Sequence, residues 1–350
     1  MKKKTSIHDI ARELNISAAT ISFVLNGKAE EKRISEELKK KILTYVKKIG
    51  YQPNLVAKSL RTGKSKILGM MVEDISDPFF SGIARGVEKS AYRLGYKIFY
   101  ASTENDEEKT KAILKVFRER QVDGYIIAPP PGIEAEIQSL IDDNIPVILF
   151  DRYFPEIATT NVIIDNYKGA YIAVEHLLKN NYEEIGFITL VSDQTQMDDR
   201  LRGYLDALNK REEEQSILKI PYNIPHDEVV EKIQTFLAES PHLDAIFFAT
   251  NHLTTKGLEA IKNLNLIIPE DLGVISFDDN THFSLFTPSI SAVAQPMNEI
   301  SEEVIKQLMK RLTNPELESE KELVVLPTQL VVRNSSLSKS LQQKKVVAKT

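Results

Sequence analysis

The chain of 350 residues contains no cysteine, and this absence removes several kinds of chemistry at once. Disulfide bonds, cysteine-ligated zinc sites and thiol nucleophiles are all excluded. The six histidines are scattered, and none has the spacing of metal ligands. We therefore expect a protein with no metal ion and no cofactor.

Long apolar runs are also missing, because no stretch approaches the roughly 20 apolar residues that a membrane-spanning helix needs. The first residues, MKKKTSIHDIARE, are basic, but His8, Asp9, Arg12 and Glu13 interrupt them at once, so they do not form a secretory signal. We expect a cytoplasmic protein with no membrane partner.

Enzyme signatures are absent as well. Neither the G-x-G-x-x-G dinucleotide fingerprint nor the P-loop motif occurs. Scattered acids could be read as a glycosidase pair, but no nucleophile elbow, metal set or pair of acids in a short motif supports that interpretation. We therefore expect that the protein is not an enzyme.

Positive charge is concentrated at the start of the chain. Residues 1–66 hold 16 Lys and Arg against 6 Asp and Glu, a balance of +10, whereas the whole chain carries −5, so the remainder carries −15. A chain of this length with 42% apolar residues can form more than one domain. A basic unit on an acidic body is typical of a nucleic-acid-binding head on a domain with another task. A solvated basic face is the simpler alternative.

The segment SIHDIARELNISAATISFVLNG, residues 6–27, predicts two short helices with a tight break between them. Ser6 and Ser17 occupy the capping positions, with Asp9 completing a capping box, and Gly27 ends the second helix. The apolar stripes consist of Ile7, Ile10 and Leu14 in the first helix and Ile21, Val24 and Leu25 in the second. A third helix runs from Ser35 to Gly50. Three such helices match a helix-turn-helix unit, whose second helix enters the major groove of DNA.

A basic segment that also contains apolar residues follows, YQPNLVAKSLRTGKS at residues 51–65. Pro53 suits the start of a helix. A helix this short is marginal alone, so we expect it to form only against DNA and a second copy of the chain. A leucine flanked by cations can wedge between base steps from the minor groove, and Leu60 has this setting.

These stretches resemble the LacI family of bacterial transcription regulators, through IHDIARELNISAATISFVLN at residues 7–26 and YQPNLVAKSL at residues 51–60. The resemblance continues to about residue 334. It implies base-reading positions at Ala18, Ala19 and Phe23 and a hinge wedge at Leu60. It also implies phosphate-contacting or supporting positions at Ser17, Thr20, Ser22 and Asn26, and we expect Asn54 of the hinge to bind DNA too.

The base-reading positions depart from the family's pattern. The family often has Arg or His where this chain has Phe23, and larger polar groups where it has Ala18 and Ala19. Without hydrogen-bond donors there, bidentate recognition of guanine is not possible, although small apolar groups can meet thymine methyls. More of the specificity should therefore come from Leu60 and from DNA shape. Packing of Phe23 against the hinge or a neighbouring helix is the alternative to a base contact.

From Lys66 onward, near-continuous apolar runs alternate with segments of helical periodicity. A first series of strands is KILGMMV, YKIFYA, DGYIIA and PVILF, and a second is NVIID, EIGFITL, AIFFA and LGVISF. Alternation of this kind predicts parallel sheets covered by helices on both faces. The predicted fold class is a small all-α helix-turn-helix domain followed by an α/β body of two sub-domains.

Polar residues follow most of these strands, and ligands of open α/β sheets bind beyond the carboxyl ends of the strands. The polar groups are Asp77, Ser102, Thr103, Asp151, Arg152, Asp165, Asn166, Asn251, Asp278 and Asp279, with Phe79, Phe80 and Tyr153 nearby. An aromatic face together with carboxylate, amide and guanidinium groups suits a sugar. As alternatives, Asp77 and Asp165 cap the helices that follow them, Asp278 or Asp279 starts a turn, and one ring of the Phe79–Phe80 pair belongs to the core.

The body also looks like the LacI family, whose regulatory part has the fold of periplasmic sugar-binding proteins. The matching motifs are DISDPFFSGIARGVE, VIIDNYKGAYIAVEHLL, DRLRGYLDAL and ISFDDNTHFSLFTPSISAV. They imply a ligand site, with Arg200 as the gripping arginine, that consists of Asp77, Phe79, Phe80, Asp151, Arg200, Asn251 and Asp278. Where the family commonly has Asn-Asp, this chain has Thr250-Asn251, which leaves the hydroxyl pattern of the ligand open.

The expected domains are a helix-turn-helix domain at 1–50, a hinge helix at 51–65, a ligand-sensing domain at 66–334 and a disordered tail at 335–350. The family's topology implies one sub-domain of about 66–160 and 292–325 and another of about 161–291 and 326–334. Because the tail lacks the sustained heptads of a tetramerising coiled coil, we expect a homodimer.

These features together predict a transcriptional repressor that a sugar or sugar derivative releases from a pseudo-palindromic DNA operator. A purine or a phosphorylated metabolite that acts as a co-repressor is the alternative ligand, with only Arg152 and Arg200 as candidate phosphate-binding cations. A sugar-binding protein without a transcriptional role is the alternative of another class, and it would leave the basic head unexplained.

Overall fold

The structure is a computed structural model that describes residues 5–51, 63–209, 216–314 and 321–338. The chain divides into two compact units, Met1–Ser65 and Lys66–Thr350, which we call the head and the body. The division coincides with the predicted end of the hinge. The predictions for Asn54 and Leu60 lie outside the described residues.

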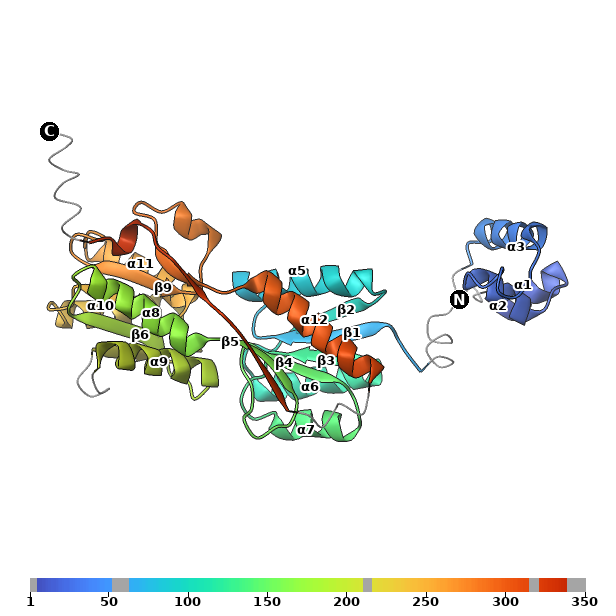
Figure 1. The fold of residues 1–350 in the computed structure, drawn as a ribbon, viewed down its shortest axis with the longest axis horizontal. Helices are drawn as coiled ribbons and strands as arrows, with labels where there is room; N and C mark the ends of the chain where they lie inside the picture. Colours follow the sequence, from blue (N-terminus) through green and yellow to red (C-terminus); the bar gives the residue numbers. More distant parts are fainter. Residues whose placement is uncertain (1–4, 52–62, 210–215, 315–320, 339–350) are drawn as a thin grey trace. The chain divides into compact units, whose positions relative to one another are not determined.

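The head contains three helices in its described part, α1 (Ile7–Leu14), α2 (Ala18–Leu25) and α3 (Glu36–Lys48) (Figure 1). Each begins directly after a serine whose side chain accepts a hydrogen bond from the backbone N–H three residues further on: Ser6, Ser17 and Ser35. Asp9 completes the predicted capping box with Ser6. The capping residues predicted from the sequence are therefore confirmed.

The core of the head is small and draws on all three helices. Its fully buried side chains include Ile10 from α1, Ile21 from α2 and Ile42 from α3. Leu25, predicted on the inner face, packs against this core but remains partly exposed. Helices this short are marginally stable alone. The three helices of the head are therefore stabilised by burying their apolar side chains against one another.

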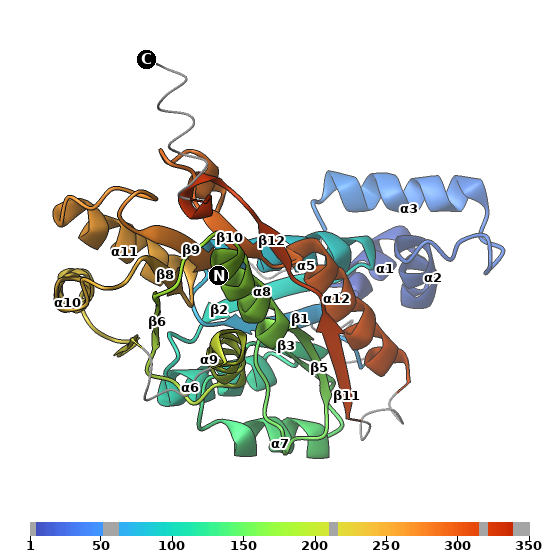
Figure 2. The ribbon, with the colours of Figure 1, turned by 60° about the vertical axis from the view of Figure 1, so that its left-hand side comes forward.

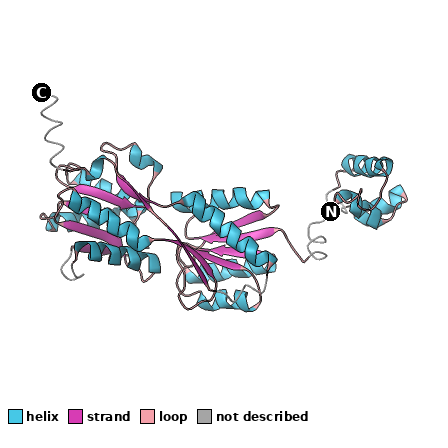
Figure 3. Cartoon of the chain, in the orientation of Figure 1, coloured by secondary structure: helices cyan, strands magenta, loops and turns pink. Residues whose placement is uncertain are grey.

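The body contains two six-stranded sheets in its described part, each with helices on both faces (Figure 3). The first, sheet A, has the order β11-β5-β4-β3-β1-β2, and all its strands are parallel. Its strands are β1 (Ile67–Val72), β2 (Lys97–Ser102), β3 (Gly124–Ile127), β4 (Val147–Phe150), β5 (Thr160–Ile164) and β11 (Glu322–Leu326).

Four helices cover sheet A: α5 (Pro78–Arg93), α6 (Glu107–Glu119), α7 (Glu134–Asp142) and α12 (Met297–Thr313). Helices α5 and α12 lie side by side on one face, and α6 and α7 cover the other (Figures 1 and 2). Strands β1, β3 and β4 are buried almost throughout because both faces are covered, which explains their near-continuous apolar sequences.

The second sheet, sheet B, has the order β12-β10-β9-β8-β6-β7 and is parallel except for the β10–β12 pair. Its strands are β6 (Ile185–Leu190), β7 (Ile217–Ile220), β8 (Ala245–Phe248), β9 (Gly273–Phe277), β10 (Ser291–Ala294) and β12 (Gln329–Val331). Helices α8 (Asn166–Lys179) and α9 (Thr195–Leu208) pack together on one face, and α10 (His226–Glu239) and α11 (Asn251–Asn263) pack on the other.

The chain crosses between the two sub-domains a few residues away from the predicted places. Strand β5 was assigned to the second sub-domain, but it pairs with β4 and β11 in sheet A. Strand β10 was expected in the first sub-domain apart from its first residue, but it pairs with β9 and β12 in sheet B. These two boundaries were wrong because apolar strands look alike in sequence, and only the hydrogen-bonded ladder decides which sheet a strand joins.

The expectation of disorder from residue 335 onward is wrong for residues 335–338. Ser335 and Ser336 are fully buried. The Ser335 hydroxyl donates to the carbonyl oxygen of Val274 at 2.6 Å, and the Ser336 hydroxyl lies 2.6 Å from that of Ser291. These polar side chains are buried because each finds a hydrogen-bond partner on sheet B. Residues 339–350 lie outside the described part of the chain.

Candidate functional site

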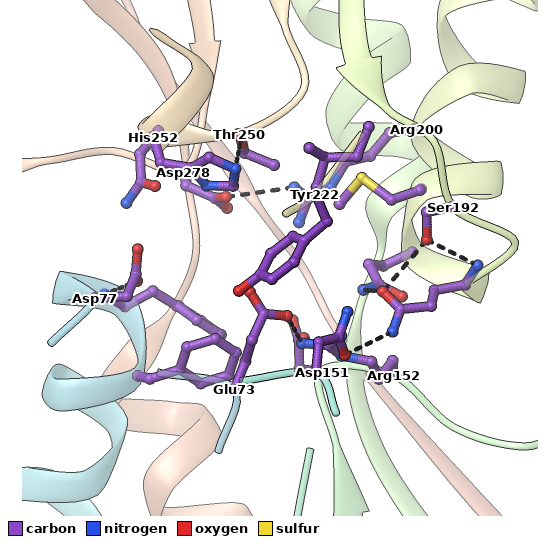
Figure 4. A pocket seen from close by; sticks show the side chains of 18 of the residues that line it. Glu73, Asp77, Asp151, Arg152, Ser192, Arg200, Tyr222, Thr250, His252 and Asp278 are labelled. Atoms are coloured by element: carbon purple, nitrogen blue, oxygen red, sulfur yellow. Dashed lines mark hydrogen bonds and ion pairs between the residues drawn. The ribbon is translucent and has the colours of Figure 1, made fainter. Parts of the chain in front are cut away.

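A pocket in the body is lined by residues from both sub-domains (Figure 4). Most of them follow the carboxyl ends of strands, β1, β2 and β4 in sheet A and β6, β7, β8, β9 and β10 in sheet B. The lining residues are Glu73, Asp77, Phe79, Phe80, Asn105, Asp151, Arg152, Leu190, Val191, Ser192, Gln194, Gln196, Met197, Arg200, Tyr222, Thr250, Asn251, His252, Asp278 and Gln295. A ligand held here would touch both sub-domains.

All seven residues that the sequence nominated for the ligand site line this pocket: Asp77, Phe79, Phe80, Asp151, Arg200, Asn251 and Asp278. The strand-end rule thus brought together side chains that lie as much as 201 residues apart in the sequence. Their contact with a ligand stays a prediction. Of the other strand-end residues, Arg152 lines the pocket, whereas Asp165 caps helix α8 and is not among the lining residues.

Asp77 combines the two roles that the sequence left open. Its carboxylate caps helix α5 by accepting the backbone N–H of Phe79 at 2.8 Å, and it also lines the pocket. Burial, together with the nearby carboxylates of Asp278 and Glu73, raises the pKa of Asp77 to about 6. Hydrogen bonds from the backbone N–H groups of Phe79 and Phe80 act in the opposite direction but are outweighed. The surrounding protein therefore compensates the charge of this carboxylate poorly.

The two phenylalanines of α5 divide as predicted between core and pocket. Phe80 is buried and packs edge-on against Phe150, with the ring centroids 6.3 Å apart. Phe79 is partly exposed and meets Phe80 at 5.0 Å. Both rings line the pocket, and Phe79 is the one with free surface to offer a ligand.

Arg152 is the centre of a buried polar network beneath the pocket. Its Nη2 donates to Glu73 at 2.6 Å, its Nε to Asp151 at 3.1 Å and its Nη1 to Asn105 at 3.1 Å. Burial acts to raise the pKa of Glu73, but the positive charge of Arg152 and hydrogen bonds from Tyr222 and Arg152 outweigh it and lower that pKa. Glu73 is therefore ionised at neutral pH.

Arg200 is buried on the opposite side of the pocket and is held on several sides. Its Nε donates to Asn166 at 2.9 Å, and its Nη1 donates to the carbonyl oxygen of Ala249 at 2.6 Å and to Asp278 at 3.3 Å. Its guanidinium stacks on the ring of Phe277, 3.7 Å from the centroid. These contacts fix the arginine in position before any ligand arrives.

Sequence reasoning missed several residues of the pocket, above all Glu73 and Tyr222. Tyr222 follows strand β7, which was not recognised in the sequence, and its side chain points across the pocket toward Glu73 of the other sub-domain (Figure 4). The Glu73 carboxylate accepts a hydrogen bond from the Tyr222 hydroxyl. Asn105 and Gln194 form a second bond between the sub-domains, at 3.3 Å. The strand-end rule could have found Glu73 and, had β7 been identified, Tyr222.

The head places its seven described DNA-binding candidates on or beside α2, and none is buried: Ser17, Ala18, Ala19, Thr20, Ser22, Phe23 and Asn26. The Ser17 hydroxyl accepts the backbone N–H of Thr20 at 3.0 Å, and the Asn26 amide donates to the carbonyl oxygen of Ser22 at 2.7 Å. Phe23 is half-buried, with the Lys32 ammonium 5.5 Å from its ring centroid. Packing within the head thus accounts for part of the Phe23 surface.

The described ranges hold neither a metal-binding cluster nor a helix that could span a membrane. No group of three or more His, Asp or Glu side chains there is arranged to hold a metal ion. No helix of those ranges is both long and apolar enough to cross a membrane.

A helix-turn-helix head joined to a two-sub-domain α/β body with a pocket at its strand ends defines a class of DNA-binding regulators that respond to small molecules. Residues 6–54 match the family described as bacterial regulatory proteins, lacI family, and residues 174–336 match the periplasmic binding protein-like domain. The chain belongs to the LacI family. The resemblance and the fold class predicted from the sequence are confirmed.

Individual relatives agree with this assignment. The chain is 32% identical over 340 residues to the HTH-type transcriptional regulator RegA of Clostridium saccharobutylicum, covering 95% of this chain and 99% of the relative. It is 30% identical over 332 residues to the ribose operon repressor of Halalkalibacterium halodurans, covering 95% and 97%. A solved structure, the lac repressor dimer bound to operator and the anti-inducer ONPF, shares the fold with a TM-score of 0.83, 21% identity and coverage of 96% and 100%.

Proposed function

We propose that this protein is a transcriptional repressor that leaves its operator when a sugar or sugar derivative enters the pocket of the body. The observation that carries the proposal is the pocket itself, in which an aromatic side chain, buried guanidiniums and carboxylates from both sub-domains meet at the carboxyl ends of the strands. The relative from Halalkalibacterium halodurans is a ribose operon repressor, which supports a sugar as the ligand of this chain.

On the DNA side, two copies of the chain would present two α2 helices to a pseudo-palindromic operator in the cytoplasm. Ala19 and Phe23 offer no hydrogen-bond donors, so α2 would meet bases mainly through apolar contacts. The excess of Lys and Arg in residues 1–66 would bind phosphates, which makes the affinity fall steeply with salt.

On the ligand side, the pocket would convert binding into a change of sub-domain orientation. The hydrogen bonds of Tyr222 with Glu73 and of Gln194 with Asn105 already join the two sub-domains. A ligand that replaces or reinforces these bonds would favour one orientation over others. If that orientation disfavours DNA, then DNA must weaken ligand binding by the same factor.

The pocket carboxylates would serve binding and not catalysis. Asp151 and Asp278 each accept a hydrogen bond from a buried guanidinium, so neither is placed as a free acid or base. The named relatives are regulators and repressors. Both observations support a protein without enzymatic activity.

The first experiment would measure DNA binding by fluorescence anisotropy, with an operator selected by the full chain from a random pool. Pentoses, hexoses, purines and phosphorylated sugars would then be added one at a time. A sugar that lowers the operator affinity supports the proposal. If no DNA can be selected, the proposal that the protein is a DNA-binding regulator is contradicted. If only purines change the operator affinity, the proposal that its ligand is a sugar is contradicted.

A further inference from the structure

The described residues that line the pocket include more acidic than basic side chains. Four are acids, Glu73, Asp77, Asp151 and Asp278, and two are arginines, Arg152 and Arg200. His252 adds no charge at neutral pH, because burial and the neighbouring Lys256 lower its pKa to about 4. An anionic ligand would therefore enter a site in which carboxylates outnumber guanidiniums two to one.

Both guanidiniums are already paired inside the protein. Arg152 uses all three nitrogens on Glu73, Asp151 and Asn105. Arg200 uses two of its nitrogens and bonds to Asp278 through one of them. A phosphate or carboxylate would therefore meet two cations whose charge these internal carboxylates already offset, and no other cationic side chain lines the described pocket.

Three of the groups that line the pocket are hydrogen-bond acceptors with few or no partners. Asp77 has no cationic partner in the described chain, and it accepts hydrogen bonds from the backbone N–H groups of Phe79 and Phe80. The Oε1 atoms of Gln196 and Gln295 are buried and have no hydrogen-bond partner among the described residues, and Gln196 as a whole is only 3% exposed. Buried acceptors without partners call for a ligand that brings donors.

We propose that the pocket takes a polyhydroxylated ligand that carries no anionic group, and that Asp77, Gln196 and Gln295 receive its hydroxyl or ammonium donors. This inference rests on the proposed function and narrows its ligand class. It excludes sugar phosphates and sugar acids, which present acceptors where the pocket also presents acceptors. It admits neutral sugars and amino sugars, which share the required donor chemistry.

Neutral sugars and amino sugars should differ in how they contact Asp77. Asp278 and Glu73 lie close enough to act on it electrostatically, so a positive charge beside Asp77 relieves repulsion among three carboxylates. A hydroxyl donor satisfies the carboxylate without relieving that repulsion. An amino sugar should therefore gain affinity over its neutral parent if its ammonium reaches Asp77.

The test is calorimetric titration of the full chain with matched sets of probes. Each set contains a neutral sugar (ribose, glucose, galactose or mannose), its terminal phosphate, its sugar acid and its 2-amino form. We expect at least one neutral or amino sugar to bind, with its phosphate and acid forms bound at least tenfold more weakly. A phosphate or acid form that binds more tightly than its parent overturns the proposal, and so does a panel in which no neutral or amino sugar binds.

Two variants separate the role of Asp77 from that of a helix cap. Asp77→Asn keeps a capping side chain but removes one negative charge, so the discrimination against phosphates should shrink severalfold. Asp165→Asn is the matched control, because Asp165 caps α8 through the backbone N–H of Lys168 at 2.8 Å and does not line the pocket. Equal effects of both variants overturn the assignment of Asp77.

The same titrations assign the donor at Asp77. An amino sugar that binds more tightly than its parent, with an advantage that Asp77→Asn abolishes, assigns an ammonium. If the amino sugar and its neutral parent bind with equal affinity, the donor at Asp77 is a hydroxyl. A bound sugar that leaves the operator affinity unchanged would contradict the proposed repressor mechanism while leaving the ligand class intact.

Discussion

The buried Arg200 of α9 and the partly buried Asp278, which follows strand β9, form an ion pair in which Nη1 lies 3.3 Å from the carboxylate. Asp278 has a second partner in Gln295, whose side-chain amide donates to the other carboxylate oxygen at 2.5 Å. Asp278 adopts a left-handed backbone conformation with φ of +68°, as Asp151 does at the end of β4 with φ of +66°. Such conformations are uncommon for residues other than glycine and gather at functional sites.

Replacing Arg200 should remove the ligand response. Arg200→Ala leaves the Asp278 carboxylate without its cation, and breaking a buried pair in this way costs about 3–5 kcal/mol of folding free energy. Arg200→Lys retains the charge but not the stacked, forked geometry, and it should still weaken ligand binding at least tenfold. Calorimetric titration measures the ligand affinity, and anisotropy should show unchanged operator affinity.

Arg202 offers the control for this prediction. It lies on the same helix, is exposed, and bonds to Asp199 at 2.7 Å. Arg202→Ala should change stability and ligand affinity little, since exposed ion pairs contribute at most about 1 kcal/mol. Ligand affinity that is unaltered in Arg200→Lys would remove Arg200 from the site.

Removing the Tyr222 hydroxyl should weaken the link between the two sub-domains at the pocket. Tyr222→Phe deletes the hydrogen bond to the ionised Glu73 across the sub-domains. A bond to a charged group contributes about 1.5–3 kcal/mol, so ligand affinity should fall about tenfold or more. Tyr100→Phe is the control, since it removes a bond to the Ala84 carbonyl outside the pocket. Equal ligand affinity in the two variants would contradict the bridging role.

The stability of the protein should respond to the titration of Asp77. Its pKa of about 6 lies above the usual value near 3.8, mainly because of burial, so the folded state holds the proton more tightly than the unfolded state. The resulting contribution to stability is complete below about pH 3.8 and is lost as the pH rises through about 6. The loss amounts to at most about 3 kcal/mol.

Asp77→Asn isolates this effect, because all other titrating groups are shared with the parent protein. Urea unfolding at pH 4 and at pH 7 measures the free energy of unfolding of each protein. Between these two pH values, this free energy should fall by up to about 3 kcal/mol more in the parent than in the variant. A difference between parent and variant that does not change with pH would mean that Asp77 titrates normally.

The hinge prediction concerns DNA specificity and falls on residues outside the described structure. Leu60→Ala should lower affinity for the selected operator at least ten times more than affinity for random DNA, because a wedge acts only where a base step opens. Lys58→Ala should lower both affinities by a similar factor, since phosphate contacts are independent of sequence. Anisotropy with both DNAs gives the comparison, and equal losses for Leu60→Ala would exclude the wedge.

Local features of this protein were predictable because they depend on neighbours in the sequence. The serines before α1, α2 and α3 cap those helices as the spacing predicted. The alternation of apolar runs and helical periodicity predicted parallel sheets, because covered strands must be apolar on both faces. The strand-end rule led to six of the seven nominated pocket residues, since the ends of parallel strands meet at one edge of a sheet, whereas Arg200 of α9 came from the family resemblance.

Contacts between distant segments were beyond the reach of the same reasoning. Strand β7 has four residues and partly exposed positions, so its apolar signal is weak, and Tyr222 was missed with it. The buried serines 335 and 336 look like a polar tail until sheet B supplies their partners. Likewise, no local pattern shows that β5 pairs with β11, whose sequence lies more than 150 residues further on.

The sequence by itself determined the helix-turn-helix head, the α/β body, the family and the residues gathered at the strand ends, because caps, periodicity and strand order are written in short stretches of chain. Only the tertiary structure decided how the charges of the pocket are shared. Arg152 and Arg200 read as free cations in the sequence, and folding pairs each of them with carboxylates, leaving Asp77 and two amide oxygens as acceptors without a cationic partner. That outcome depends on distances between side chains far apart in the chain, which no sequence pattern specifies.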